Sequence, residues 1–263
     1  MPLSLRWPDS ANWLWRSEEI SPQLYKLART APDDDRFWAG MRDLFGFDRW
    51  QHPEAVTRVA GALPPRLPMA PLPMTFLSRF QGAPLWSLPW RQAVPPVLCR
   101  EFAARLGQQL GLLHREPVPG WGHPASGYLT LDAWPERARR FVEAHPMAPD
   151  TATLALDWPR PSRAVWCLPD LRSDQFLRGA TDWFWSDWEA LVWAPVEFDL
   201  CLVELLFADT SHCHAFLDNY RRYARLPSLE PFRPGMRVVA LMMGLHGEGA
   251  EAWILNHPEW LKG

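Results

Sequence analysis

Two carboxylates flank a short segment in the second half of the chain. Asp170 stands in an expected loop, and Asp187 follows after a pair of short apolar runs. These runs lie on either side of Gly179, a pattern that predicts a β-hairpin over residues 176–185. Because a hairpin returns the chain to the place where it began, both carboxylates can meet at one pocket.

Such a pocket would hold the residue types that phosphoryl transfer needs. One carboxylate orients the acceptor hydroxyl group and accepts its proton, while a second carboxylate, together with an amide five residues after the first, holds magnesium. Gln175 stands at that amide position. A lysine from elsewhere must reach the phosphates, and the chain has only Lys26 and Lys262. We therefore expect Lys26, on a short strand-like run, to face the carboxylates.

Each of these residues also has a simpler interpretation. Asp170 follows a proline and could be an ordinary turn residue. Asp187 could cap a helix, and Lys26 could lie on the surface. The tryptophans near the hairpin are more typical of a core than of a ligand platform.

The elements that would position this segment differ between the two parts of the chain. The first third is expected to be mixed α/β, with an acidic helix start that suits free N–H groups and the helix dipole, followed by a stiff proline-rich connector. A glycine–proline break near residues 80–84 predicts the boundary between two lobes. The expected elements are a strand at 23–27, a helix at 33–45, an extended connector at 63–73 and a strand at 74–80.

The remainder of the chain is expected to be mostly helical. Apolar residues spaced by three and four, from Leu98 to Leu113, predict a helix over 97–115. A second helix is expected over 133–144, with Asp132 as its cap. From Asp199 onward the pattern is helical almost to the last residue.

Composition limits the classes of function. The 263 residues allow one large or two small domains. With 27 basic and 30 acidic residues, the net charge of −3 gives no electrostatic case for nucleic acid. No signal peptide or membrane-spanning run is seen, and the four cysteines form no CxxC pair. We therefore expect a cytoplasmic protein with no nucleic-acid or membrane partner.

Several segments together resemble a known family. Residues 168–177 read LPDLRSDQFL, residues 186–190 read SDWEA, residues 194–200 read APVEFDL, and residues 106–114 read LGQQLGLLH. In this order and spacing they resemble the aminoglycoside phosphotransferase and choline-kinase-like group, as a diverged member. The segment 81–85 is similar to the hinge of that family.

The resemblance implies an α+β, bilobal protein-kinase-like fold. A small N-lobe would span residues 1–82, and a helical C-lobe would span residues 83–263 with its catalytic loop and hairpin at 164–190. It further implies an ATP- and magnesium-dependent phosphotransferase that acts on the hydroxyl group of a small molecule.

The residue roles follow from the same resemblance. Asp170 would be the catalytic base, Gln175 and Asp187 the metal ligands, and Lys26 the contact to the nucleotide phosphates. Asp199 would fix the C-lobe. The acidic partner of the lysine on a nearby helix would be Asp35 or Asp43, and His114 is expected to cap the end of its helix.

The sequence also departs from the family pattern. Leu168 and Pro169 replace a histidine and a glycine, and Gln175 is one methylene longer than the usual asparagine. No glycine precedes Gly40, so no glycine-rich loop can cover the phosphates ahead of Lys26. An alternative interpretation is therefore a decayed pseudokinase that acts as a binding or scaffolding module, with a protein as its partner. An unrelated helical protein with accidental matches is a further alternative.

Overall fold

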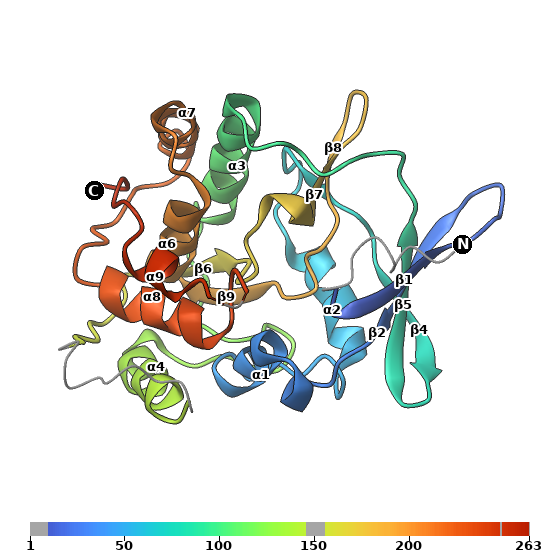
Figure 1. Cartoon of the computed structure of the whole chain (residues 1–263), viewed down its shortest axis with the longest axis horizontal. Helices are drawn as coiled ribbons and strands as arrows, with labels where there is room; N and C mark the ends of the chain where they lie inside the picture. The colour runs from blue at the N-terminus through green and yellow to red at the C-terminus, as the bar shows by residue number, and fades with distance from the viewer. Residues whose placement is uncertain (1–9, 146–155, 248, 263) are drawn as a thin grey trace.

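An antiparallel four-stranded sheet forms one end of the molecule (Figure 1), with strand order β1-β2-β5-β4. The computed structural model describes residues 10–145, 156–247 and 249–262. The strands are β1 (Asn12–Arg16), β2 (Gln23–Ala28), β4 (Thr75–Phe80) and β5 (Ala83–Pro89). Lys26 lies on β2, directly opposite Leu14 of β1. The expected strand around Lys26 is confirmed.

Two short helices follow β2. The expected helix with an acidic start is confirmed: the 3₁₀ turn η2 (Pro32–Asp34), which contains Asp33 and Asp34, leads into α1 (Arg36–Asp43). Asp35 caps α1 by accepting hydrogen bonds from the backbone N–H groups of Phe37 and Trp38. The second helix, α2 (Pro53–Val59), continues into η3 (Ala60–Ala62). It packs on the sheet, where the indole of Trp86 donates to its first residue, Pro53, at 3.0 Å.

The break near residues 80–84 is not a hinge. Gln81 and Gly82 form the turn between β4 and β5, with φ of 50° and 85° respectively, and β5 then pairs with β2. Glycine accepts such a left-handed backbone without strain, which explains its place in this turn. Residues 83–89 thus belong to the same sheet as Lys26. We propose that the two lobes join within residues 90–99 and not at residue 82.

Helices fill the opposite end of the molecule (Figure 1), as expected. Their bounds are α3 (Arg100–Leu113), α4 (Trp134–Glu143), α6 (Val196–Leu206), α7 (Thr210–Tyr220), α8 (Arg233–Met242) and α9 (Glu251–Leu255). Most of the apolar stripe on α3 is buried, whereas Leu98 precedes the helix and is exposed. Asp132 does not cap α4: it lies in η4 (Leu131–Ala133) and pairs with Arg160, while Ala133 occupies the cap position.

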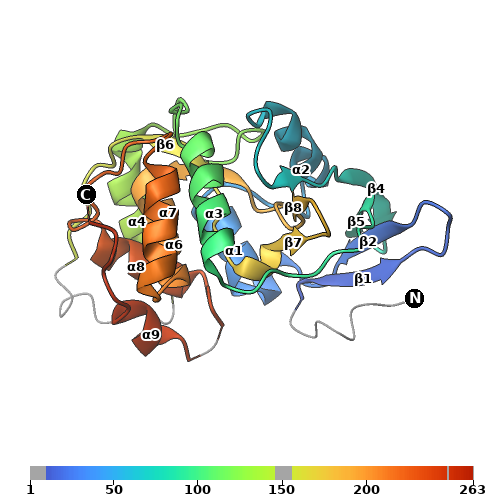
Figure 2. The ribbon, with the colours of Figure 1, turned by 90° about the horizontal axis from the view of Figure 1, so that it is seen from above.

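The remaining strands are short: β3 (Ala70–Pro71), β6 (Ala164–Cys167), β7 (Phe176–Arg178), β8 (Trp183–Trp185) and β9 (Val192–Pro195). Two of them, β7 and β8, lie between the sheet and the helices (Figure 2). The hairpin of β7 and β8 is confirmed, and β3 pairs with β8 in parallel. Three nearby tryptophans, Trp183, Trp185 and Trp188, are buried, as expected of core residues. Within the described ranges, no helix is both long and apolar enough to cross a bilayer.

Candidate active site

Lys26 and Asp187 form an ion pair across 161 positions of sequence. The Lys26 Nζ lies 2.9 Å from Asp187 Oδ1. The lysine side chain is 5% exposed and the aspartate side chain 37% exposed, so the pair sits at the edge of the interior. Burial lowers the pKa of Lys26, but the carboxylates of Asp187 and Glu189 outweigh burial and leave this pKa above its ordinary value. Both side chains of the pair are therefore charged.

Asp170 and Gln175 meet beside that pair. Asp170 follows strand β6, and Gln175 ends the 3₁₀ turn η5 (Ser173–Gln175). The Gln175 Nε2 donates to Asp170 Oδ2 at 2.6 Å. The backbone carbonyl of Gln175 in turn accepts from the backbone N–H groups of Ser186 and Asp187, at 2.9 and 3.2 Å. Because Gln175 contacts both segments, the loop of Asp170 and the end of the hairpin are held together.

The environment of Asp170 makes its carboxyl group a weak acid. Burial, together with the nearby carboxylates of Asp187, Asp174 and Asp35, raises its pKa to about 7 against the opposing effect of Arg172. Asp187 behaves in the opposite way. Burial alone would raise its pKa, but Lys26 lowers it below the ordinary value. Two carboxyl groups at one site thus have separated pKa values, a pattern typical of acid–base sites.

Arg172 was not singled out from the sequence. Its Nη1 lies 3.4 Å from Asp170 Oδ1, and its Nε lies 3.0 Å from Asp174 Oδ1. The side chain is 47% exposed, so the guanidinium stands at the mouth of the site with part of it in solvent. Its position two residues after Asp170 was the only signal available in the sequence.

A second buried ion pair, between Arg49 and Glu189, was also missed. The Arg49 Nη1 lies 2.9 Å from Glu189 Oε1, and the two side chains are 0% and 4% exposed. Asn12 of β1 donates to the same carboxylate oxygen at 2.8 Å and accepts from Arg49 at 3.0 Å. The guanidinium also lies 3.8 Å from the centre of the Trp38 ring, in a cation–π contact.

The sequence predicts Asp35 or Asp43 as the acidic partner of Lys26, and the structure shows that neither residue pairs with it. Asp35 is used as the cap of α1 and accepts a further hydrogen bond from Thr30. Asp43 pairs with Arg42 at the surface. Each carboxylate thus has another local partner, and Asp187 is the residue that pairs with Lys26.

The helix-end histidine and Asp199 form a separate buried contact. His114 is the C-cap residue of α3, but its ring is turned inward, and its Nε2 lies 2.9 Å from Asp199 Oδ2. The other ring nitrogen is 3.1 Å from the hydroxyl group of Tyr220. Both members of the pair are fully buried, so Asp199 joins α3 to α6, in line with the expectation that it fixes the helical part.

The donor set suits a hard cation. Asp187 and Asp170 offer carboxylate oxygens and Gln175 offers an amide oxygen, which are the ligand types that magnesium takes. Across the described part of the chain, no cluster of three His, Cys, Asp or Glu side chains could hold a metal by itself. Magnesium at nucleotide sites needs no such cluster, because one or two carboxylates, waters and phosphate oxygens complete its shell. The residues present therefore fit magnesium carried by a nucleotide.

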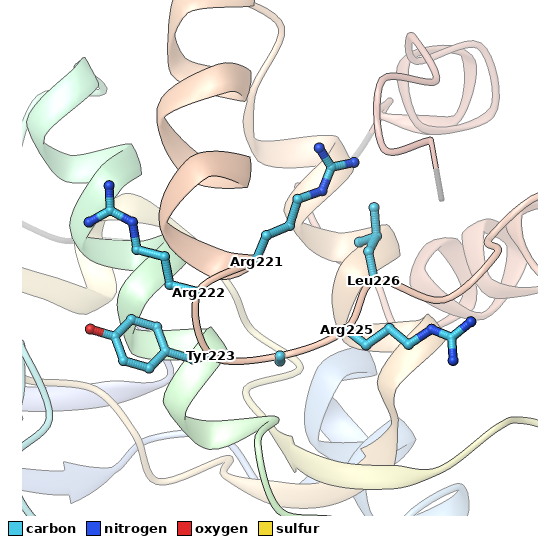
Figure 3. A pocket seen from close by; sticks show the side chains of 6 residues that line it. Arg221, Arg222, Tyr223, Arg225 and Leu226 are labelled. Carbon is cyan, nitrogen blue, oxygen red and sulfur yellow. The ribbon is translucent and has the colours of Figure 1, made fainter.

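A hollow of about 550 Å³ lies elsewhere, directly after α7. It is lined by residues 221–226, none of which belongs to the site described above. Figure 3 shows that the side chains of Arg221, Arg222 and Arg225 point away from one another. The three guanidinium groups therefore do not converge on a single anion.

Comparison with solved structures identifies the fold. The chain is similar to macrolide 2′-phosphotransferase MphH from Brachybacterium faecium, with 18% identity, 94% of this chain and 89% of that chain covered, and a TM-score of 0.56. It is also similar to aminoglycoside phosphotransferase APH(4)-Ia, with 12% identity, coverage of 98% and 90%, and a TM-score of 0.55. A third similar structure is spectinomycin phosphotransferase APH(9)-Ia, with 15% identity, 94% of this chain and 84% of that chain covered, and a TM-score of 0.50.

No family model and no curated protein matches this sequence. The structural likeness confirms the fold that was expected: an α+β, protein-kinase-like arrangement shared with phosphotransferases of the aminoglycoside phosphotransferase group. An unrelated helical protein with accidental motif matches is thereby excluded.

Proposed function

We propose that this protein is an enzyme that transfers the terminal phosphoryl group of ATP to a hydroxyl group of a small molecule. The observation that carries the proposal is the meeting of Lys26, Asp170, Gln175 and Asp187 at one place, although they come from β2, two loops and the end of a hairpin. A set of charged and amide groups brought together from distant segments is suited to positioning a nucleotide.

Each side chain has a role in this proposal. Lys26 binds the phosphates as a point charge, and Asp187 and Gln175 hold magnesium through oxygen atoms. Magnesium supplies charge neutralisation on the transferring phosphoryl group when it is bound. Asp170 orients the acceptor hydroxyl group and takes its proton, and a pKa of about 7 leaves the carboxylate available at neutral pH. Arg172, next to Asp170, adds positive charge at the mouth of the site.

The structural neighbours support the nucleotide part of the proposal. Spectinomycin phosphotransferase APH(9)-Ia was solved with ADP and spectinomycin. Amicoumacin kinase hAmiN, with a TM-score of 0.51, was solved with AMP-PNP and Ca²⁺. For this chain, ATP, magnesium and a small hydroxylated acceptor are inferred from the side chains named above.

The test is a screen of hydroxylated metabolites and antibiotics for acceptor-dependent conversion of ATP to ADP. The proposal expects at least one acceptor to be phosphorylated, with the rate lowered about 10²–10⁴-fold in Asp170→Asn. The matched control is Asp182→Asn, in the β7–β8 turn, which should leave the rate unchanged. Equal rates in Asp170→Asn and the wild type would refute the assignment of Asp170.

A pseudokinase remains the second candidate, and one observation favours it. The Gln175 side chain is 2% exposed and its nitrogen is bound to Asp170, so this amide already serves a contact within the protein. A binding module of this kind would take up ATP without transferring its phosphate. The same screen, combined with a measurement of ATP binding, distinguishes the two functions, since ATP binding without transfer to any acceptor would indicate the module.

A further inference from the structure

Among the residues that the structure describes, the Lys26 ammonium group has one hydrogen-bond partner, Asp187, and the proposed function needs that carboxylate for another task. The lysine is 4% exposed and its ammonium group is bound to Asp187. If Asp187 turns to magnesium, the ammonium group loses its carboxylate partner within the protein and depends on the nucleotide phosphates alone, although a buried charge without compensation costs several kcal/mol. A second carboxylate within reach of Lys26 would hold the ammonium group in place for the phosphates.

The sheet register identifies where that carboxylate lies. Lys26 is directly opposite Leu14, and Asn12 is two residues before Leu14 on the same strand. Alternate residues of a strand share a face, so Asn12 and Lys26 project from the same face of the sheet as diagonal neighbours. Asp187 binds Lys26 and Glu189 binds Asn12, at 2.9 and 2.8 Å. The two carboxylates therefore lie side by side against this face.

One carboxylate oxygen of Glu189 is available to accept a hydrogen bond from Lys26. Its Oε1 accepts from Asn12 and Arg49, whereas its Oε2 is buried and has no hydrogen-bond partner among the residues that the structure describes. A buried carboxylate oxygen without a donor is costly and rare in proteins. Glu189 pairs with Arg49 through Oε1, and its charge already acts on Lys26.

We infer that Glu189 is the second acceptor of the Lys26 ammonium group, which it holds through Oε2 when Asp187 leaves to bind metal. It takes the place of the helix carboxylate that the sequence led us to expect at Asp35 or Asp43. Glu189 is a positioning residue: it acts on the nucleotide only through Lys26. The reason for the exchange rests on the proposed function, but the exchange itself can be tested without a nucleotide.

The experiment uses the scarcity of lysine in this chain. With only Lys26 and Lys262, protein labelled with ¹⁵N-lysine gives two side-chain ammonium signals in an NMR spectrum. The exchange rate of the Lys26 ammonium protons with water reports whether this group is held by a carboxylate. Asp187→Asn removes the negative charge of the first partner while keeping the shape of the side chain, and its amide oxygen is a weaker acceptor than a carboxylate.

Our inference expects the exchange rate in Asp187→Asn to stay within about threefold of the wild type, because Glu189 takes over the ammonium group. Adding Glu189→Gln to that variant should accelerate exchange by at least about tenfold. Adding Asp43→Asn instead is the matched control, and it should leave the rate of the single variant unchanged.

Two outcomes would overturn the inference. One is fast exchange already in Asp187→Asn, and the other is an Asp187→Asn protein that does not fold, because each means that no second carboxylate takes the buried ammonium group. These readouts contain no nucleotide and no turnover. A protein that fails to bind ATP but gives the expected exchange rates would therefore refute the proposed function and leave the role of Glu189 intact.

Discussion

Asp170 and Asp187 show how position decides the behaviour of two chemically identical groups. Asp187 has a buried lysine 2.9 Å away, and its pKa is lowered. Asp170 is bound by a neutral amide and by one partly exposed guanidinium, and burial raises its pKa to about 7. A carboxyl group held in this way lowers the stability of the folded protein at neutral pH, and such losses of stability are common at functional sites.

The raised pKa predicts a pH-dependent effect of Asp170→Asn on stability. Between the ordinary pKa of 3.8 and about 7, the folded wild type binds a proton that the unfolded chain has lost. The stability of the wild type therefore falls as pH rises through this window and is level above it. The variant lacks this loss, so it should be about 4 kcal/mol more stable than the wild type at pH 8 and show no such gain at pH 4.

Urea unfolding of both proteins at pH 4, 6 and 8 measures this difference. The transitions should diverge as pH rises. If the free energies of unfolding run parallel across the range, Asp170 has the same pKa in the folded and unfolded states, and its proposed electrostatic environment is wrong.

At the scale of elements, the segment after β8 is held from several sides. Asp187 binds β2 through Lys26, Glu189 binds β1 through Asn12, and the indole of Trp188 donates to the backbone of Leu72 at 2.9 Å. Three consecutive side chains thus contact three different segments. Glu189 also pairs with Arg49, and both side chains of this pair are buried.

Replacing Arg49 should therefore destabilise the fold strongly. Arg49→Met leaves the Glu189 carboxylate buried without its cation, which should lower the free energy of unfolding by about 3–5 kcal/mol. Arg58→Met is the matched control, because Arg58 pairs with Glu54 on the surface of α2 with 66% of its side chain exposed. That change should cost less than about 1 kcal/mol. Equal losses in chemical denaturation would show that burial of the Arg49 pair is not what matters.

The packing of α3 on α7 depends on glycine. A Cβ atom on Gly107 would lie 2.3 Å from the backbone oxygen of Phe216. Because this clash is with backbone, it cannot be relieved by moving a side chain. Alanine is a better helix former than glycine by about 1 kcal/mol. Close backbone contact should reverse that preference at this position.

Gly107→Ala is thus expected to lower the thermal unfolding temperature, with a loss of about 1–3 kcal/mol from forced separation of the helices. Gly61→Ala, where nothing lies within 4 Å of the added methyl group, should be neutral or stabilising. A stabilised Gly107→Ala protein would contradict the described contact between α3 and α7.

For the whole molecule, local sequence patterns predict the elements better than their connections. The strand of Lys26, the helix expected over 97–115 and the β7–β8 hairpin follow from apolar spacing and turn residues. All three are present, and the helix spans residues 100–113. The turn at Gln81 was misplaced as a hinge because a glycine–proline break signals any change of direction. Only the pairing of β5 with β2 distinguishes a turn inside a sheet from a boundary between lobes.

The candidate site was predictable only in part for a similar reason. Motif spacing indicated Asp170, Gln175 and Asp187, and the scarcity of lysine indicated Lys26. The partners Arg49 and Glu189 are 140 positions apart, and nothing local to either residue indicates the other. Long-range ion pairs arise from tertiary packing, which a single sequence does not reveal.

The most direct test of the central claim is calorimetric binding of ATP with and without magnesium. Our account predicts binding to the wild type that requires magnesium and is weakened at least about tenfold in both Lys26→Met and Asp187→Asn, since each removes a charge that faces the nucleotide. Absence of ATP binding by the folded wild type at millimolar concentrations, or equal affinity in the two variants and the wild type, would contradict it.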